Sequence, residues 1–350
     1  ICYGSTGFFM AVNDVFSAPR RYMTIIITFF LCTLFVLVFV NTSSTMRSDT
    51  FITTFGTRSD LYYTDLTEAM SSMNPDGRKQ IEEYFAKTEA LLQENGMPAK
   101  LCVETQYKYK VRFNGKDYSI NCQQGIHTKA SDYEYTDGVV PQNKNEIAIT
   151  PTVSKLTGAK LGDTVTIDFG TGTLDCIVVA YFQSMNQLGE VIRLHEDAPT
   201  DFTYIANVMS YQIDFDDHPS AKEIEIRKEK IKKLFDNEKV MNATEYCDDC
   251  MGAASTMESV QYLLLGITLI VVILVCILME RSFLADEKSQ IAVLKAMGFG
   301  NRRVMEWHMI RFGIVTLVAV LLATICSIPA TYLIGNPIFG MMGAGKVAYV

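Results

Sequence analysis

Three long apolar runs without a single charged residue divide the chain. They cover residues 23–40, 259–279 and 312–335. A helix needs about 20 apolar residues to cross a hydrocarbon core of ~30 Å at ~1.5 Å per residue. We therefore predict three membrane-spanning helices, because buried helices of soluble proteins are usually shorter and keep a polar edge.

Basic residues beside these runs predict the orientation of the chain. Arg20 and Arg21 precede the first run, and six basic residues lie between positions 281 and 311. Because Lys and Arg collect on the cytoplasmic side, we place residues 1–22, an amphipathic elbow, and the loop 280–311 in the cytoplasm. Residues 41–258 and 336–350 are then extracytoplasmic. Of the 39 acidic residues, those outside the large outer region are Asp14, Glu280, Asp286, Glu287 and Glu306.

A β-hairpin is the clearest element of the outer region. Apolar and polar positions alternate from Val103 to Phe113, and Asn114 and Gly115 form the favoured two-residue turn. Pairing around this turn keeps one face apolar across both strands, with Val111 opposite Tyr118, Tyr109 opposite Ile120 and Tyr107 opposite Cys122. The polar face carries Glu104, Gln106, Lys108, Lys110 and Arg112.

Further elements predict an α+β domain between the first two membrane helices. Asn74 as N-cap and Pro75 at the first helical position begin a helix that stops at Gly96. We expect one compact insert with one or two lobes. The other predicted elements are a strand at 145–150, a helical turn and loop at 151–163, a hairpin at 164–182 and a helix at 220–235.

Candidate chemistry is sparse. The four histidines are scattered, so we predict no catalytic site, metal site or cofactor. In the hairpin register Cys102 and Cys122 are offset by about 16 Å, which excludes a direct disulfide. Cys247 and Cys250 have the spacing of a redox motif, but the two aspartates between them raise thiol pKa values. We interpret this pair as a local disulfide or as two unreactive thiols.

The cytoplasmic loop holds a polar segment with two glycines between apolar runs. Its composition predicts that the second membrane helix continues to Met297 and ends at Gly298 and Gly300. Asn301 then caps a helix that runs into the third span, with Trp307 and Arg311 as anchors at the membrane interface.

This helix-turn-helix segment has an apolar centre and a charged rim below the membrane. Such a surface fits docking to another protein, and it fits contact with lipid headgroups equally well. The apolar side chains predicted to be exposed are Ile291, Val293, Leu294, Met297 and Phe299.

The loop sequence EKSQIAVLKAMGFGNRRV resembles the corresponding loop of the FtsX-like permeases of ABC transporters, the family that includes MacB and the lipoprotein-releasing permeases. Residues 8–22 and 145–167 are similar to the elbow and to part of the outer domain of that family. The matching positions of the loop are Glu287, Ile291, Leu294, Lys295, Ala296, Met297, Gly298, Arg302 and Arg303.

The resemblance implies a multi-pass protein of the bacterial plasma membrane, with an α-helical transmembrane bundle and a large α+β extracytoplasmic domain. A fourth membrane helix is expected beyond the chain end, and the chain is expected to be part of a longer protein. ATP hydrolysis is expected in a separate ATPase chain or domain that docks on the loop. The docking residues are then Glu287, Ile291, Leu294, Lys295, Ala296, Met297, Gly298, Phe299, Gly300, Arg302 and Arg303.

Three functions remain open from the sequence. The first is a permease that exports or extracts peptides, antibiotics or lipoproteins. The second is a transmembrane regulator of a cell-wall hydrolase or of antimicrobial-peptide sensing, and the third is a membrane-anchored receptor without an ATPase. The expected partners are an ATP-binding cassette ATPase, a second permease half, membrane lipid and an extracytoplasmic protein, and no nucleic acid.

Overall fold

The computed structural model divides the chain into two compact units, each described by itself here. The helical unit comprises Ile1–Ser44, Ala254–Gly335 and Tyr349. The outer unit comprises Thr45–Ala253, Asn336–Ala348 and Val350. The structure describes residues 6–17, 19–46, 48–251, 254–298, 300–341, 343–345, 347 and 349.

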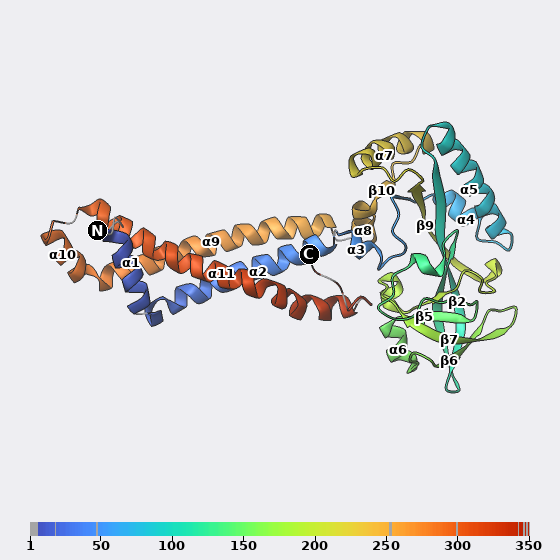
Figure 1. Cartoon of the computed structure of the whole chain (residues 1–350), viewed down its shortest axis with the longest axis horizontal. Coiled ribbons are helices and arrows are strands. Elements are labelled where there is room, and N and C mark those ends of the chain that lie inside the picture. The colour runs from blue at the N-terminus through green and yellow to red at the C-terminus, as the bar shows by residue number, and fades with distance from the viewer. Residues whose placement is uncertain are drawn as a thin grey trace. The chain divides into compact units, whose positions relative to one another are not determined.

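Among the described residues, most of the helical unit is made up of five helices (Figure 1). Three of them contain segments long and apolar enough to cross a membrane, namely Arg20–Met46, Tyr262–Asp286 and Asn301–Met341. The predicted fold class, a membrane helix bundle with a large outer α+β domain, is therefore confirmed. The helices are α1 (Thr6–Ser17), α2 (Pro19–Met46), α9 (Ala254–Asp286), α10 (Lys288–Ala296) and α11 (Asn301–Met341).

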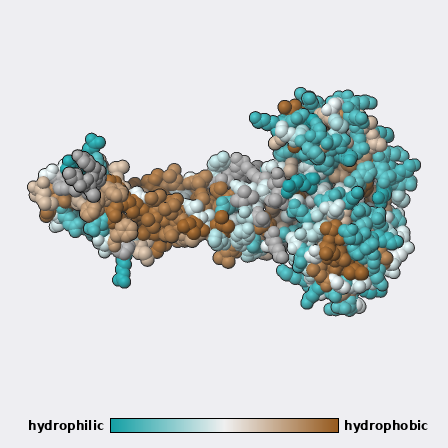
Figure 2. Space-filling model, in the orientation of Figure 1, coloured by the Kyte–Doolittle hydropathy of each residue, from teal (hydrophilic) through white to brown (hydrophobic). Residues whose placement is uncertain are grey.

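The membrane helices extend beyond their apolar runs. Helix α11 has 41 residues, or about 60 Å at ~1.5 Å per residue, which is twice the thickness of the hydrocarbon core. It ends at Met341, beyond the expected end of the third span at residue 335. Figure 2 shows apolar residues over much of the surface of the long helices, as expected for contact with lipid.

Small and polar side chains form a buried stripe on α11. Val315 and Ala319 begin this stripe, which continues at four-residue spacing through Ala323, Ser327 and Thr331. Residues four apart lie on one face of a helix, and small side chains let membrane helices approach closely. Asn41 of α2 donates a hydrogen bond to the Thr331 hydroxyl at 3.3 Å.

In the described part of the outer unit, ten strands form one sheet in the order β10-β1-β9-β2-β3-β8-β5-β7-β4, and β6 pairs with β2 and β7. The β3–β8 and β5–β7 pairs are parallel and the others are antiparallel. The strands are β1 (Leu61–Tyr63), β2 (Ala99–Phe113), β3 (Lys116–Ile126), β4 (Asp137–Gly138), β5 (Glu146–Ile149), β6 (Thr164–Asp168), β7 (Thr173–Tyr181), β8 (Val191–Leu194), β9 (Ile205–Phe215) and β10 (Val240–Asn242).

Short and long helices surround this sheet, with α5 and α7 towards one end and α6 towards the other (Figure 1). The α-helices are α3 (Asp49–Ile52), α4 (Leu66–Ser71), α5 (Gly77–Glu94), α6 (Pro151–Thr157), α7 (Ala221–Phe235) and α8 (Ala243–Met251). Three turns of 3₁₀-helix lie at Ala130–Asp132, Asn186–Gly189 and Phe202–Tyr204.

The predicted β2–β3 hairpin is confirmed residue by residue. Val111 pairs with Tyr118, Tyr109 with Ile120 and Tyr107 with Cys122. Asn114 and Gly115 have φ of 51° and 75°, which are the positive values that a type I′ turn requires. The strands and helical turn predicted at 145–182 are also present as β5, α6, β6 and β7.

The first long helix of the outer unit begins later than predicted. Asn74 and Pro75 precede the helix, which starts at Gly77 with Asp76 as N-cap. The side-chain oxygen of Asn74 accepts a hydrogen bond from the Asp76 backbone at 2.9 Å. The Asn74 side chain is therefore engaged in a local turn and does not cap the helix, so the helix begins later in the sequence.

Helix α7 buries two cations that its apolar pattern did not reveal. Arg227 and Lys228 are both buried. Arg227 donates to Asp217 at 2.7 Å, and Lys228 donates to Glu245 of α8 at 2.7 Å. Buried charges require such partners, so α7 is held to its neighbours by ion pairs as well as by Ile231.

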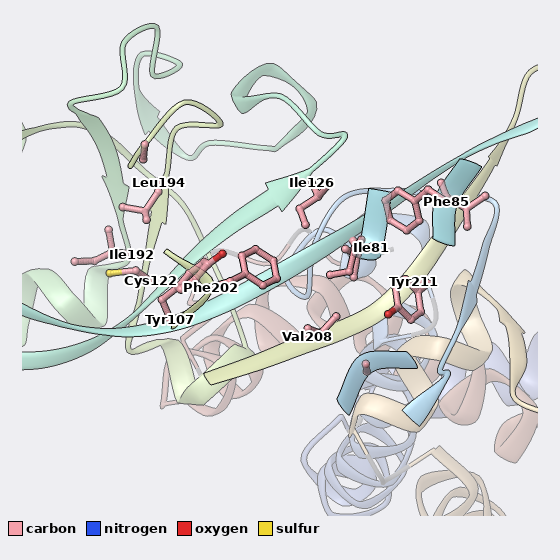
Figure 3. Close-up of a cluster of buried hydrophobic side chains, with 14 of the residues drawn as sticks. Ile81, Phe85, Tyr107, Cys122, Ile126, Ile192, Leu194, Phe202, Val208 and Tyr211 are labelled. Atoms are coloured by element: carbon pink, nitrogen blue, oxygen red, sulfur yellow. The ribbon is translucent and has the colours of Figure 1, made fainter. Parts of the chain in front are cut away.

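A large apolar cluster fills most of the core of the outer unit (Figure 3). Ile81 and Phe85 of α5 pack against Tyr211 of β9, and the same cluster continues to Cys122 and Ile192 beyond β2. A smaller, separate cluster is formed by Ala148, Ala180, Phe182 and Val191. Because the contacts of the large cluster are continuous, the predicted insert has a main core that extends from α5 to β8.

The opposite face of β2 is also covered near its start. Glu104 and Gln106 were expected on a polar face, yet both are buried. A Cβ atom on Gly56 would lie 2.6 Å from a carboxylate oxygen of Glu104. The segment around Gly56 therefore lies directly over this face, and strand alternation alone does not reveal such a cover.

Candidate functional site

The cytoplasmic loop forms a helical hairpin with a break that the sequence did not predict. Helix α9 ends at Asp286, and α10 starts at Lys288 with Glu287 as its N-cap. The expected helix was continuous to Met297. Gly298 has φ of 91°, which explains a glycine at this turn.

The predicted start of the following helix is shifted by one residue. Asn301 was expected to cap it, but Asn301 is its first residue. The carbonyl of Gly300 accepts hydrogen bonds from the backbone of Arg303 and Val304 at 3.0 and 3.3 Å. The helix then continues into the third span without interruption, as predicted.

The predicted docking residues differ in exposure. Met297, a member of the predicted docking set, is 64% exposed. Val293, which lies outside that set but was expected to be exposed, is 57% exposed. Phe299 lies outside the described residues. The remaining exposed members of the predicted set are Lys295, Ala296, Gly298, Gly300, Arg302 and Arg303.

Ile291 and Leu294 face inwards, although they were expected to be exposed. Both are half-buried and pack against a small cluster formed by Ala11, Val304 and Trp307. Helix α1 therefore rests on α10 and on the start of α11. Of the five apolar side chains expected to be exposed in this segment, Val293 and Met297 are the exposed ones among the described residues.

Trp307 and Arg311, which were expected as membrane-interface anchors, are buried inside the helical unit. Trp307 is 5% exposed and Arg311 is completely buried. Indole and guanidinium groups do serve as anchors when they lie at a helix surface. Here both side chains point towards neighbouring helices, which the position beside an apolar run does not reveal.

Arg311 is the centre of a buried ion cluster. Its guanidinium donates to both carboxylate oxygens of Glu287, at 2.8 and 3.0 Å, and to Asp14 at 3.0 Å. Glu287 is 1% exposed. The Tyr22 hydroxyl also donates to Asp14, at 3.2 Å. Glu287, a predicted docking residue, is thus turned away from solvent and joined to α11 and α1.

Two further helix ends join the same cluster. Arg21 at the start of α2 lies 2.9 Å from Glu287 and 3.6 Å from Asp286. His308 Nδ1 lies 2.8 Å from Arg311 Nη2 and 3.3 Å from Glu280. Four of the five acidic residues outside the outer region therefore gather at one point. The small number of acidic residues outside the outer region is visible in the sequence. Their spacing along the helices does not show that they meet at one cluster.

The outer unit contains a second buried ion pair that the sequence did not indicate. Glu104 and Arg193 lie 3.9 Å apart and are almost fully buried. The guanidinium stacks on the rings of Tyr133 and Phe182, at 3.7 and 4.4 Å. Burial raises the pKa of the Glu104 carboxyl. The segment around Gly56 covers this pair, and the pair links β2 to β8.

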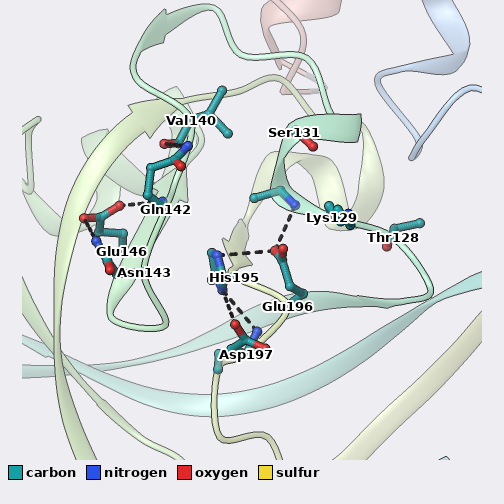
Figure 4. A network of polar contacts seen from close by, with 12 residues as sticks. Thr128, Lys129, Ser131, Val140, Gln142, Asn143, Glu146, His195, Glu196 and Asp197 are labelled. Atoms are coloured by element: carbon teal, nitrogen blue, oxygen red, sulfur yellow. Dashed lines mark hydrogen bonds and ion pairs between the residues drawn. The ribbon is translucent and has the colours of Figure 1, made fainter.

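His195 is a structural residue of the outer unit (Figure 4). Its Nδ1 accepts a hydrogen bond from the Asp197 backbone at 3.1 Å, and its Nε2 lies 3.5 Å from Glu196. Glu196 in turn accepts from the Ala130 backbone at 2.9 Å. Within the described ranges, no group of His, Cys, Asp and Glu residues is arranged to hold a metal ion.

Cys247 and Cys250, which we interpreted as a local disulfide or as two unreactive thiols, are not joined by a disulfide in the structure. Both residues lie on α8, and Cys250 is an exposed free cysteine. Residues three apart on a helix have Cβ atoms about 5–6 Å apart, whereas a disulfide needs about 3.8 Å. Cys122 pairs with Tyr107, which confirms the register that separates it from Cys102.

Comparisons with known proteins identify the C-terminal part of the chain. Residues 262–348 match the family described as FtsX-like permease C-terminal. No curated protein sequence matches the chain.

Three solved structures show weak similarity. The periplasmic region of MacB from Actinobacillus actinomycetemcomitans has 12% identity and a TM-score of 0.32, with coverage of 56% of this chain and 94% of that one. The extracellular domain of the noncanonic ABC-type transporter YknZ from Gram-positive bacteria has 14% identity and a TM-score of 0.30, with coverage of 53% and 99%. A domain of a putative permease from Porphyromonas gingivalis has 14% identity and a TM-score of 0.27, with coverage of 41% and 74%.

Proposed function

The chain carries an FtsX-like permease C-terminal domain in residues 262–348, and from this premise we propose that it transmits the work of a partner ATPase to its outer domain. A permease of this family is a non-catalytic membrane subunit, so ATP hydrolysis belongs to the partner. The three spans and the cationic loop make the chain a multi-pass membrane protein with an extracytoplasmic domain.

The observation that carries this proposal is the buried contact between Arg311 and Glu287. Glu287 immediately precedes helix α10. Arg311 lies almost three turns from the start of α11 at ~3.6 residues per turn. Asp14 and Arg21 attach α1 and α2 to the same pair. A force applied to α10 therefore reaches three other helices through charges that are costly to separate.

The outer unit is suited to receive such a movement. Strand β1, which follows the first membrane helix in the chain, pairs with β10, which precedes the second. The rings of Tyr62 and Tyr246 stack beside this pair with centroids 4.3 Å apart. Both connections to the membrane therefore enter one sheet as neighbouring strands. A relative shift of the two membrane helices acts directly on β9 and β2, which are the next strands in the sheet.

The apolar runs favour work outside the bilayer over transport through it. Residues 23–40, 259–279 and 312–335 contain no charged side chain, whereas ion-coupled pathways normally keep ionisable groups in the membrane. We therefore place the action on the substrate at the outer domain. Export or extraction of peptides, antibiotics or lipoproteins by a dimer of permease halves is the specific form that we propose.

Co-purification with the ATPase tests the docking step. Met297→Glu combined with Val293→Glu places two carboxylates on the exposed apolar part of α10, so we expect loss of bound ATPase and of its stimulation. The control is Leu66→Glu, because Leu66 is 66% exposed on the outer unit. If the ATPase remains bound to the α10 variant as it does to the wild type, the docking assignment is wrong. If no ATPase co-purifies even with the wild-type protein, the function of a membrane-anchored receptor without an ATPase is favoured instead.

A further inference from the structure

A groove beside the cytoplasmic hairpin has the features of a lipid site. It has a volume of about 760 Å³ and is lined by residues of α9, α10 and α11. One end of the groove lies on the membrane side, where Ile277 belongs to the apolar run that ends at Met279. The other end lies on the cytoplasmic side, where Asn301 belongs to the loop between the spans. The groove therefore extends from the membrane-spanning part of the helices, across the membrane interface, to the cytoplasmic loop.

The upper walls of the groove are continuous with the lipid-facing surface. Ile277 is 50% exposed and Met309 is 69% exposed. Phe312, the first residue of the third apolar run, also lines the groove. A water-soluble protein does not reach this depth, whereas an acyl chain of the inner leaflet lies there by default.

The lower rim of the groove carries two cations. Arg281 and Lys295 both line it and are exposed. Among the described residues, neither has a carboxylate within ion-pair distance, in contrast to Arg21 and Arg311 nearby. Basic groups between membrane helices on the cytoplasmic side attract anionic headgroups. These cations follow the apolar wall in the direction of the cytoplasm, which is the order in which a lipid presents its tails and its phosphate.

One carboxylate also lies among the described lining residues. Glu280 is directed to α11, where its Oε1 lies 3.3 Å from His308 Nδ1. Arg281 and Lys295 thus provide a net positive rim even with Glu280 present. We propose that this groove binds an anionic phospholipid of the inner leaflet, with the phosphate between Arg281 and Lys295 and the acyl chains along Ile277, Met309 and Phe312.

Quenching of tryptophan fluorescence by brominated lipid measures this binding directly. Trp307 is the single tryptophan of the chain, and its ring lies 4.7 Å from that of His308, which lines the groove. The intact protein is placed in phosphatidylcholine nanodiscs that contain a small fraction of brominated phosphatidylglycerol or of brominated phosphatidylcholine. We expect stronger quenching by the phosphatidylglycerol at equal mole fraction, and reversal by unlabelled phosphatidylglycerol.

Paired variants separate a defined site from general attraction to a basic loop. Arg281→Gln with Lys295→Gln should lower the preference for phosphatidylglycerol by roughly 10- to 30-fold. Each basic residue near the membrane surface raises the affinity for an anionic lipid about fivefold, and the two factors multiply. Lys288→Gln with Arg303→Gln removes the same charge from exposed positions that do not line the groove, and it should retain most of the preference. Thermal unfolding of all variants shows whether each is folded.

Three outcomes overturn the proposal. Equal quenching by both lipids in the wild type shows that the groove does not select charge. Equal loss in both double variants shows general surface attraction, and absence of quenching by either lipid shows that a protein segment fills the groove. The assay needs neither nucleotide nor ATPase, so its failure leaves the proposed motor coupling intact, and failure of ATPase docking leaves the lipid site intact.

Discussion

Arg311 and Glu287 face each other across the start of the cytoplasmic hairpin, with two donated hydrogen bonds of 2.8 and 3.0 Å and almost no exposure to solvent. Two charges in such a place are stable only when each has its partner. The pair also fixes the break between α9 and α10, because Glu287 turns inwards where the helix would otherwise continue.

Removal of one member of this pair should destabilise the helical unit. Arg311→Leu takes the buried cation away from Glu287, which keeps the partly exposed Arg21, and from Asp14, which is half-buried. The loss of such a buried partner costs up to about 3–5 kcal/mol. In Glu287→Leu with Arg311→Leu the buried charges of the pair are both absent, so much of this loss should be recovered. Thermal unfolding in a constant detergent measures the difference.

The matched control for this pair is an exposed one. Arg302 lies 3.4 Å from Glu306, and the two side chains are 91% and 50% exposed. Arg302→Leu should change stability by less than about 1 kcal/mol. A loss as large in Arg302→Leu as in Arg311→Leu contradicts the importance of burial.

The stacked pair Tyr62 and Tyr246 should be needed for movement of the outer domain. Tyr246→Ala removes the ring contact beside β1 and β10 and leaves a cavity, whereas Tyr246→Phe keeps the ring. We expect the alanine variant to bind and stimulate the ATPase normally but to show a smaller ATP-driven distance change. Spin labels on the outer units of the two permease halves measure that change.

Two results argue against this role of the stacked pair. One is an unchanged distance response in Tyr246→Ala. The other is an equal loss in Tyr246→Phe, which indicates that the hydroxyl matters and the stack does not.

The β2–β3 turn provides a local test of the predicted hairpin. Gly115 has φ of 75° and open space around it, so Gly115→Ala is disfavoured by the backbone alone and should cost about 1 kcal/mol. Gly172→Ala, in another hairpin, also enters open space but has no positive φ. It should be nearly neutral in unfolding measurements, and equal effects of the two substitutions contradict the argument.

The sequence predicted elements whose signals are local. The hairpin followed from alternation plus Asn114 and Gly115. The helical turn expected within 151–163 is present as α6, whose ends the structure shows to be capped by the Thr150 hydroxyl, which accepts from Val153, and by Gly158 with φ of 86°. The buried charges were not predictable in the same way. Asp14 and Arg311 are 297 positions apart, and a charge beside an apolar run has the same appearance whether it faces headgroups or another helix.

The burial of both faces of β2 near its start was likewise not predictable from the sequence. Glu104 alternates correctly with its neighbours, but the segment around Gly56 and the side chain of Arg193 pack against it and bury its face. The helix start at Gly77 was missed because Asn74 forms a turn of its own. Both errors arise where tertiary contact or a competing side-chain hydrogen bond overrides the local pattern.

Asp214 should make the stability of the outer unit depend on pH. Burial raises the pKa of its carboxyl from 3.8 to about 6, although the Ser59 hydroxyl donates to it at 3.2 Å. An acid with a higher pKa in the folded state binds its proton more tightly there. Its favourable contribution is therefore complete below the unfolded pKa and is lost as pH rises through about 6.

Asp214→Asn tests this directly, because the amide keeps the shape and an acceptor for Ser59 without the charge. At neutral pH the variant should be more stable than the wild type by roughly 2–3 kcal/mol, and the wild type should approach it as the pH falls below about 6. Asp216→Asn changes an exposed residue of the same segment and should leave the pH profile unchanged. Unfolding of the outer unit, followed by hydrogen exchange of its β9 amides across this pH range, measures all three proteins. A wild-type profile that stays parallel to that of Asp214→Asn at every pH excludes Asp214 as the titrating group.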